Sequence, residues 1–146
     1  MANKDNATIG KAYRHHVRDR AETELGWIVI GENYRHESGV EFDVYCRDSY
    51  GREVGIECKA SNDDASGEKG LARTDNVWKV LGYLDCLKEW ARGMGSDLRD
   101  LPFRYVVVTS HLGKPGSNFR KLLDREELLG FVTIVEMPWD GWQDGA

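Results

Sequence analysis

The sequence has few of the features that mark secreted, membrane-spanning or disordered proteins. It contains three cysteines and three prolines in 146 residues, and no apolar run approaches the roughly 20 residues that a membrane-spanning helix needs. The N-terminal residues M-A-N-K-D-N lack the apolar core of a signal peptide. Hydrophobic residues make up 40% of the chain, enough for a folded core. The sequence therefore predicts a soluble cytoplasmic protein that has no membrane partner.

The cysteines Cys46, Cys58 and Cys86 favour buried, reduced thiols over a disulfide or a zinc site. Their number is odd, and no two of them have C-x-x-C spacing. Cys46 and Cys58 also fall in alternating apolar segments, where a thiol packs as a small apolar side chain.

Length and net charge limit the number of domains and the kind of partner. The 146 residues suit one domain over residues 1–146, with a core over about residues 9–136 and a short C-terminal tail. The net charge of −5 argues against a protein that coats nucleic acid without specificity. It leaves room for an enzyme that acts on nucleic acid, because a metal ion would neutralise part of the acidic excess.

Residues 39–59 predict a β-hairpin with one core face and one polar face. Apolar and polar residues alternate in both halves, which is the period of a half-buried strand, and D-S-Y-G supplies the turn. The apolar set assigned to the core face is Val40, Phe42, Val44, Cys46, Val54, Ile56 and Cys58.

The polar face of this hairpin predicts a cluster of charges. With the turn centred near Tyr50, Asp43 lies opposite Glu57, and Glu41 lies opposite Lys59. Opposed side chains of an antiparallel pair have Cβ atoms roughly 4.5–5.5 Å apart, so two carboxylates placed in this way repel each other. A divalent cation such as Mg²⁺ would compensate them, and Lys59 would orient a water or stabilise charge on a phosphate. The alternative is an exposed hairpin face with a Glu41–Lys59 ion pair.

Patterns before and after the hairpin predict a mixed sheet with helices on its faces. Stripes at i, i+4 and i, i+3, i+4 spacing indicate two long helices, and short apolar runs indicate further strands. Residues 31–39 predict a loop, as do the small and polar residues 61–70, which either close over a substrate or form a plain surface connection. The predicted order, α-β-β-β-α-β-α-β, is helix 8–25, strand 27–30, the hairpin 39–59, helix 75–92, strand 103–109, a helix between Ser117 and Gly130 with Phe119, Leu122, Leu123 and Leu128 inward, and strand 131–136.

Two helix surfaces suggest partners. The first predicted helix is the most basic part of the sequence, and its Lys11, Arg14 and Arg18 either meet a phosphate backbone or form a solvated face. In the helix 75–92, the aromatic residues Trp78, Tyr83 and Trp90 widen the apolar face. That wider face either caps the core or forms a homodimer contact.

The element order and the charged hairpin together resemble the PD-(D/E)XK superfamily of metal-dependent nucleases, which includes restriction endonucleases and archaeal-type Holliday-junction resolvases. The motif consists of an Asp on the second strand and E-x-K on the third, here Glu57-Cys58-Lys59. The resemblance covers about residues 9–110 and is greatest to the resolvase-like branch. The residues that match that branch are Gly26-Trp27, Arg35, Ser38-Gly39 and Asp43.

The resemblance implies an α/β, restriction-endonuclease-like fold, a mixed β-sheet flanked by helices, and a Mg-dependent deoxyribonuclease. Asp43, Glu57 and Lys59 would be the catalytic residues for hydrolysis of phosphodiester bonds. Asp43, Glu57 and the main-chain carbonyl of Cys58 would bind Mg²⁺ or Mn²⁺, and Lys59 would position the attacking water.

The implied partner is DNA, with branched DNA as one substrate class. Arg35 and Ser38 would touch the phosphate backbone, beside the basic helix residues Lys11, Arg14 and Arg18. A resolvase cuts two strands symmetrically, which favours a homodimer. The alternatives are a catalytically impaired nucleic-acid-binding or interaction module of the same fold, an exonuclease, or an RNA-directed nuclease of the superfamily.

A third metal-binding carboxylate is missing from the place that the resemblance assigns to it. Resolvase-like members carry a Glu in the first half of the opening helix, where this sequence has Tyr13-Arg14-His15-His16. Four explanations follow: His15 or His16 substitutes, Glu22 or Glu24 reaches in from later in the helix, Glu41 supplies the ligand from the strand, or the site is impaired.

Overall fold

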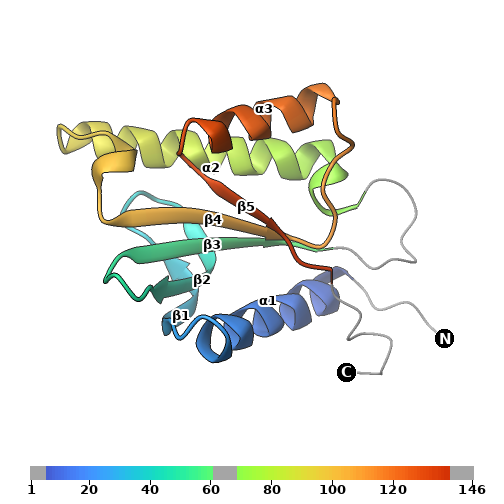
Figure 1. Cartoon of the computed structure of the whole chain (residues 1–146), viewed down its shortest axis with the longest axis horizontal. Helices are drawn as coiled ribbons and strands as arrows, with labels where there is room; N and C mark the ends of the chain where they lie inside the picture. Colours follow the sequence, from blue (N-terminus) through green and yellow to red (C-terminus); the bar gives the residue numbers. More distant parts are fainter. Residues whose placement is uncertain (1–5, 61–68, 139–146) are drawn as a thin grey trace.

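In the computed structural model, which describes residues 6–60 and 69–138, one mixed sheet lies between α1 on one face and α2 and α3 on the other (Figure 1). The α-β-β-β-α-β-α-β order and the α/β class predicted from the sequence are confirmed. None of the helices in these two ranges is long and apolar enough to cross a membrane. The elements are α1 (Asn6–Thr23), β1 (Ile28–Arg35), β2 (Glu41–Arg47), β3 (Glu53–Lys59), the short helix η1 (Gly70–Ala72), α2 (Thr74–Gly93), the short helix η2 (Leu98–Asp100), β4 (Phe103–Thr109), α3 (Asn118–Leu128) and β5 (Thr133–Glu136).

The sheet has the strand order β1-β2-β3-β4-β5. The first three strands are antiparallel, whereas β4 runs parallel to both β3 and β5. Val44 pairs with Ile56 and Arg47 with Glu53, which is the register predicted from a turn near Tyr50. The central β3 therefore has paired strands on both sides, and its last residues lie beside the start of β2.

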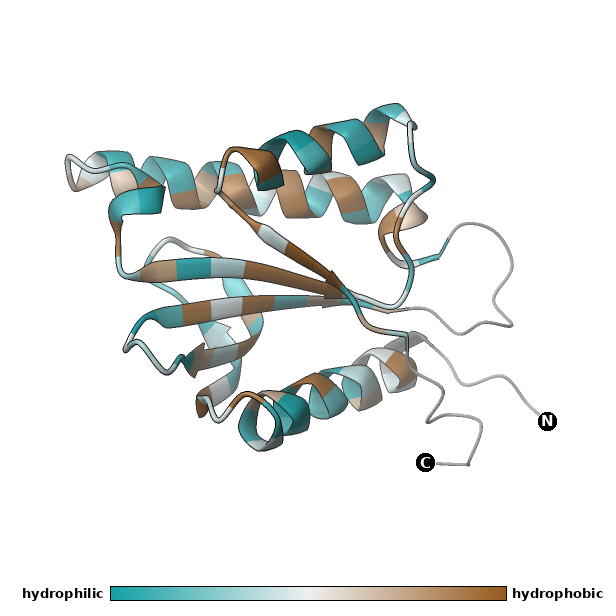
Figure 2. Cartoon of the chain, in the orientation of Figure 1, coloured by the Kyte–Doolittle hydropathy of each residue, from teal (hydrophilic) through white to brown (hydrophobic). Residues whose placement is uncertain are grey.

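The predicted single core face of the hairpin is wrong, because helices cover both faces of the sheet. Val44 and Ile56 pack with α1 in one apolar cluster. Phe42 instead joins Tyr45 in a second cluster against α2. Figure 2 shows the resulting pattern, with apolar residues concentrated in β4 and β5 and banded along the helices. Of the charged residues on β2 and β3, Glu57 is buried, Asp43 and Lys59 are half-buried, and Glu41 and Arg47 are exposed.

Strand β1 is longer than predicted, and the predicted loop over residues 31–39 is mostly strand. Glu32 pairs with Val44 and Arg35 with Glu41 along β2. The polar residues of this segment do not show the apolar alternation of a strand, because the contact that stabilises them comes from α1. Arg14 binds the Glu32 carboxylate, with Nε 2.9 Å from Oε1. Such a contact between distant segments leaves no local pattern in the sequence.

Helix α3 begins as predicted, but one of its assigned core residues is exposed. Ser117 caps the helix, with its Oγ accepting a hydrogen bond from the Arg120 N–H at 3.2 Å. Leu123 is buried, whereas Leu128 is 88% exposed, because five residues at 100° each place it about 140° around the helix from Leu123. Glu126 occupies the inward side instead, and its Oε2 lies 3.0 Å from Lys88 Nζ.

The aromatic residues that widen the apolar face of α2 lie partly in the core and partly at the surface. Trp90 packs its ring on His36 and Phe103, at centroid distances of 4.6 and 5.7 Å, so this end of the face caps the core. Trp78 is 56% exposed. The prediction that the loop over residues 61–70 closes over a substrate falls on residues 61–68, which lie outside the described part of the chain.

Gly70, at the start of η1, holds the end of β3 in place and provides a stability test. Its φ is +52°, and an added Cβ would lie 2.7 Å from Thr109 Oγ1 and 2.8 Å from the His111 carbonyl oxygen. Thr109 Oγ1 donates a hydrogen bond to the Lys59 carbonyl at 2.8 Å. We expect Gly70→Ala to lower the free energy of unfolding by about 2 kcal/mol or more, measured by urea denaturation.

Gly82→Ala is the matched control for this substitution. Gly82 lies within α2, and nothing lies within 4 Å of its added Cβ. Alanine is the better helix former, so this variant is expected to gain roughly 0.5–1 kcal/mol. If Gly70→Ala and Gly82→Ala lowered the free energy of unfolding by similar amounts, the role assigned to Gly70 would be contradicted.

Candidate active site

The start of β2 and the end of β3 bring together the three residues that the sequence predicted as catalytic. Asp43 Oδ2 accepts a hydrogen bond from the Cys58 N–H at 2.7 Å, and a further hydrogen bond joins the Asp43 and Glu57 carboxyl groups. Lys59 Nζ lies 3.5 Å from Glu57 Oε1. The hairpin therefore does not form an exposed face with a Glu41–Lys59 ion pair. Glu41 is exposed and pairs along the strand with Arg35.

Glu57 is a buried acid without full hydrogen bonding. Its residue is 4% exposed, and its Oε2 is buried with no hydrogen-bond partner. Burial raises the pKa of Glu57 well above its usual range, and the hydrogen bond and charge of Asp43 raise it further, while Lys59 and Lys79 lower it. The folded, metal-free protein therefore keeps this carboxyl protonated at neutral pH. A group in this state gains most from a cation beside it.

The donor set fits a hard divalent cation. An unpartnered carboxylate oxygen of Glu57 adjoins a second carboxylate, that of Asp43, and Mg²⁺ prefers one or two carboxylates together with waters and phosphate oxygens. Over residues 6–60 and 69–138, however, no three His, Cys, Asp or Glu side chains gather closely enough to hold a metal by themselves. The described residues thus supply two carboxylates to this site.

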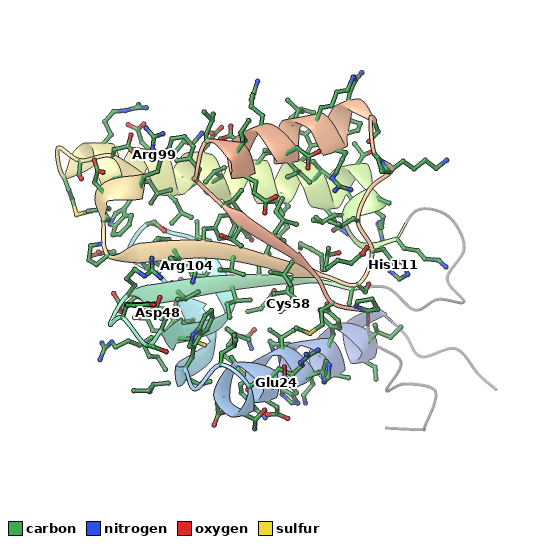
Figure 3. All side chains as sticks on the ribbon, in the orientation of Figure 1. Glu24, Asp48, Cys58, Arg99, Arg104 and His111 are labelled. Atoms are coloured by element: carbon green, nitrogen blue, oxygen red, sulfur yellow. The ribbon has the colours of Figure 1, made fainter. Side chains whose placement is uncertain are left out.

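Glu24 is not brought to these carboxylates. It is exposed, and its Oε2 lies 2.7 Å from Arg20 Nη2. It lines an apolar groove beside Ile56 and Val106, whose side chains belong to the α1 face of the sheet. Figure 3 shows Glu24 on α1, across the sheet from α2. The predicted role of Glu24 as a third carboxylate therefore has no support from its position.

Of the further candidates for a third ligand, His15, His16 and Glu22 lie on α1, and Glu41 lies at the start of β2. His15 Nε2 lies 3.3 Å from Glu32 Oε1 on β1. Glu22 is exposed near the end of α1, and Glu41 is exposed at the start of β2. Glu41 is the nearest of these to Asp43 along the chain.

Two of the basic residues predicted to bind nucleic acid hold α1 on the sheet. Arg14 and Arg18 both bind the Glu32 carboxylate, with Arg18 Nη1 2.6 Å from Oε2. Burial tends to raise the pKa of Glu32, but the hydrogen bonds from the two guanidinium groups outweigh it and lower the pKa. Arg18 also pairs with Asp19, with Nη2 3.1 Å from Oδ1, so two carboxylates balance the two guanidinium charges, whereas Lys11 is exposed on the same helix.

The predicted backbone contacts Arg35 and Ser38 differ in their surroundings. Arg35 is exposed at the end of β1. Ser38 shapes the turn before β2: its Oγ lies 2.7 Å from His36 Nδ1 and accepts a hydrogen bond from the Val40 N–H at 3.3 Å. Ser38 thus has a structural part in placing the strand that carries Asp43.

Three residues that the sequence pattern did not assign to the site interact electrostatically with Glu57. Lys79 and Tyr83 come from α2, and Tyr105 comes from β4, where its buried hydroxyl has no hydrogen-bond partner. Burial raises the pKa of Tyr105 well above its usual range, and the charge of Glu57 adds to this. The helical pattern identified only the core stripe of α2. The available signal was the spacing of Lys79 and Tyr83, four residues apart and hence on one face of the helix.

Comparison with known proteins identifies a shared fold. No protein-family model matches the sequence, and no curated protein matches it. The structure of an EndoMS–dsDNA complex superposes with a TM-score of 0.56 at 18% identity, over 96% of this chain and 48% of that chain. The crystal structure of a repair endonuclease from Pyrococcus abyssi superposes with a TM-score of 0.53 at 21% identity, over 95% of this chain and 50% of that chain. This chain thus has the α/β fold of both and spans about half their length.

Proposed function

We propose that this protein is a metal-dependent endonuclease that hydrolyses phosphodiester bonds of DNA. The observation that carries the proposal is the connected group of Asp43, Glu57 and Lys59 at the junction of β2 and β3. The fold shared with a repair endonuclease and with a protein bound to double-stranded DNA adds support. Two close carboxylates beside a lysine are the residue types that metal-assisted hydrolysis of a phosphodiester requires.

The resemblance to metal-dependent nucleases implies a role for each residue of the group, and its contacts support that role. Asp43 and Glu57, with the main-chain carbonyl of Cys58, would hold Mg²⁺ or Mn²⁺. When bound, the cation supplies an activated water and withdraws charge from the phosphate. The Cys58 N–H fixes the Asp43 carboxylate, and the Lys59 ammonium, 3.5 Å from Glu57 Oε1, orients the water and stabilises charge that develops on the phosphate.

The proposed substrate is branched DNA. The resolvase-like set of Arg35, the Ser38–Gly39 pair and Asp43 supports a structure-specific endonuclease that cuts branched DNA as a homodimer. Exposed Lys11 and Arg35 lie outside the Glu32 ion-pair cluster and offer positive charge to a phosphate backbone.

A cleavage assay tests the proposal. Purified protein is incubated with four-way-junction, duplex and single-stranded DNA in Mg²⁺, Mn²⁺ or EDTA, and the products are separated on denaturing gels. We expect internal cuts in Mg²⁺ or Mn²⁺, most rapidly in the junction, and none in EDTA. Release of mononucleotides from the ends would indicate an exonuclease, and cutting that persists in EDTA would contradict a metal-dependent mechanism.

The two-carboxylate site favours one further candidate function, a DNA-binding or interaction module of the same fold without cleavage. The described residues place no third carboxylate beside Asp43 and Glu57. Calorimetric titration with Mn²⁺ separates the two functions. A nuclease is expected to give a binding heat that disappears in Asp43→Asn, whereas a binding module gives no heat that depends on Asp43.

A further inference from the structure

The face of α2 that looks onto the carboxylates carries a lysine and a tyrosine one turn apart. Lys79 and Tyr83 lie next to the buried stripe residues Val80 and Leu84, so they stand at the border where the helix leaves the core. Lys79 Nζ is 5.7 Å from the centroid of the Tyr83 ring. Tyr83 thus limits the positions that the long lysine side chain adopts.

Helix α2 packs on the face of the sheet that carries Glu57, because Val107, the β4 partner of Glu57, shares an apolar cluster with Val80 and Leu84. The charge of Lys79 lowers the pKa of Glu57, and the charges of Glu57 and Asp43 raise the pKa values of Lys79 and Tyr83. For Tyr83, burial is the largest cause of the raised pKa. For Lys79, burial lowers the pKa, and Tyr83 raises it more than Glu57 or Asp43 does. Two lysines, one from β3 and one from α2, therefore flank the same pair of acids.

The two lysines differ in what they can do. Lys59 has a side chain 11% exposed and is paired with Glu57 inside the site. Lys79 is exposed and contacts a tyrosine, which is neutral at pH 7. Its ammonium charge is thus open to an anion that arrives from solvent, unlike the charges of Arg14 and Arg18, which the carboxylates of Glu32 and Asp19 balance.

We propose that Lys79, oriented by Tyr83, is a subsite that binds a backbone phosphate of the DNA and so sets the position of the strand over Asp43 and Glu57. This inference rests on the proposed nuclease function and adds the α2 face to its DNA contacts. Lysine suits the role, because its ammonium binds a phosphate as a point charge from any direction and so carries no sequence preference. Lys79 is therefore a positioning residue, and its loss is expected to affect KM more than kcat.

The direct test is DNA binding without chemistry. In an Asp43→Asn background, binding of labelled duplex and junction DNA is followed by fluorescence anisotropy over a series of salt concentrations in EDTA. Lys79→Met is expected to weaken binding roughly fivefold to tenfold at low salt, and to reduce the slope of log K against log salt by about 0.9, the value for one phosphate contact. Lys79→Arg is expected to restore the slope, and Tyr83→Phe to give a smaller loss.

Lys121→Met is the matched control, because it removes an exposed lysine from the neighbouring α3. It is expected to leave the slope unchanged, and thermal unfolding of each variant checks that the fold is kept. An unchanged slope and affinity in Lys79→Met would overturn the subsite.

The nuclease proposal and the subsite can fail separately. Suppose that the wild-type protein binds DNA but does not cut it, and that Lys79→Met reduces the slope of log K against log salt. The nuclease proposal then fails and the phosphate contact stands. If it cuts DNA, and Lys79→Met changes neither KM nor the slope, the subsite fails and the nuclease stands. Absence of DNA binding by the wild-type protein would overturn both.

Discussion

Replacing Glu57 by glutamine is expected to stabilise the metal-free protein near pH 8 while abolishing cleavage of DNA. Burial and the neighbouring Asp43 raise the pKa of Glu57 well above its usual range. In the unfolded chain the same group ionises near pH 4.3. Between these two pKa values the folded state binds a proton that the unfolded state has lost, so the stability of the wild-type protein falls as the pH rises.

Glutamine removes this dependence, because it is neutral at every pH and its amide donates a hydrogen bond to the Asp43 carboxylate. We expect Glu57→Gln to be more stable than the wild-type protein by about 1–3 kcal/mol near pH 8, the usual cost of an uncompensated buried polar group. The difference should vanish near pH 4, where Glu57 is protonated in both states. Urea denaturation in EDTA at several pH values measures it.

A divalent cation is expected to reverse the order of stability. The wild-type protein gains RT ln(1 + [L]/Kd) from binding, whereas the variant lacks one of the two carboxylates and gains less. Glu41→Gln, which changes an exposed carboxylate on the neighbouring strand, is the control and should leave the unfolding free energy unchanged. A Glu57→Gln variant that is less stable than the wild-type protein near pH 8 in EDTA would contradict the buried, protonated acid.

Replacing Gly55 by alanine is expected to cost about 3 kcal/mol, at the upper end of the range for overpacked cores. An added Cβ would lie 2.6 Å from Phe42 Cε1 and Cζ. That ring cannot yield easily, because it is fully buried among Tyr45, Phe103 and Tyr105, at centroid distances of 5.7, 5.9 and 5.9 Å. Thermal and urea unfolding measure the loss.

The same substitution should also lower cleavage, because Gly55 lies two residues before Glu57 on β3 and opposite Tyr45 on β2. A shift between these strands would separate Glu57 from Asp43. Phe42→Leu in the same chain makes room for the added methyl group, so the double variant should be more stable than the sum of the single changes predicts. Simple additivity of the two losses would contradict a clash between these residues.

Local patterns in the sequence predicted most of the fold. Alternation with period 2 and the D-S-Y-G turn gave the register of β2 and β3, and the β-branched run gave β4 as residues 103–109. These features depend on neighbours in the chain, which a sequence displays directly. Leu128 was misassigned because it lies about 140° around α3 from the buried Leu123, outside the inward side of the helix.

Contacts between distant segments account for what the sequence did not reveal. The polar second half of β1 is strand because Arg14 and Arg18 of α1 bind Glu32. Phe42 and Val44 lie two residues apart on β2, where regular alternation predicts one shared face, yet they pack in clusters on opposite faces of the sheet.

Within the site, the sequence located Asp43, Glu57 and Lys59 but left their surroundings open. Lys79 and Tyr83 come from a helix whose pattern records only the residues facing the core. Glu24, about one turn beyond the buried Ala21 of α1, is exposed and paired with Arg20. A charge within an apolar stripe near a helix end often reaches solvent, because the stripe continues beyond the part of the helix that packs.

The central claim is that Asp43, Glu57 and Lys59 form one metal-dependent catalytic group, and cleavage by an Asp43→Ala, Lys59→Ala double variant tests it most directly. Rates for the wild-type protein, each single variant and the double variant are compared in Mg²⁺ and Mn²⁺ on the DNA that the wild-type protein cuts fastest. Groups that act as a unit give strongly non-additive losses, so we expect each single change to cost about 10³-fold or more and the double change little beyond that. Metal-dependent cutting by the double variant at a rate near that of the wild-type protein would contradict the assignment of this site.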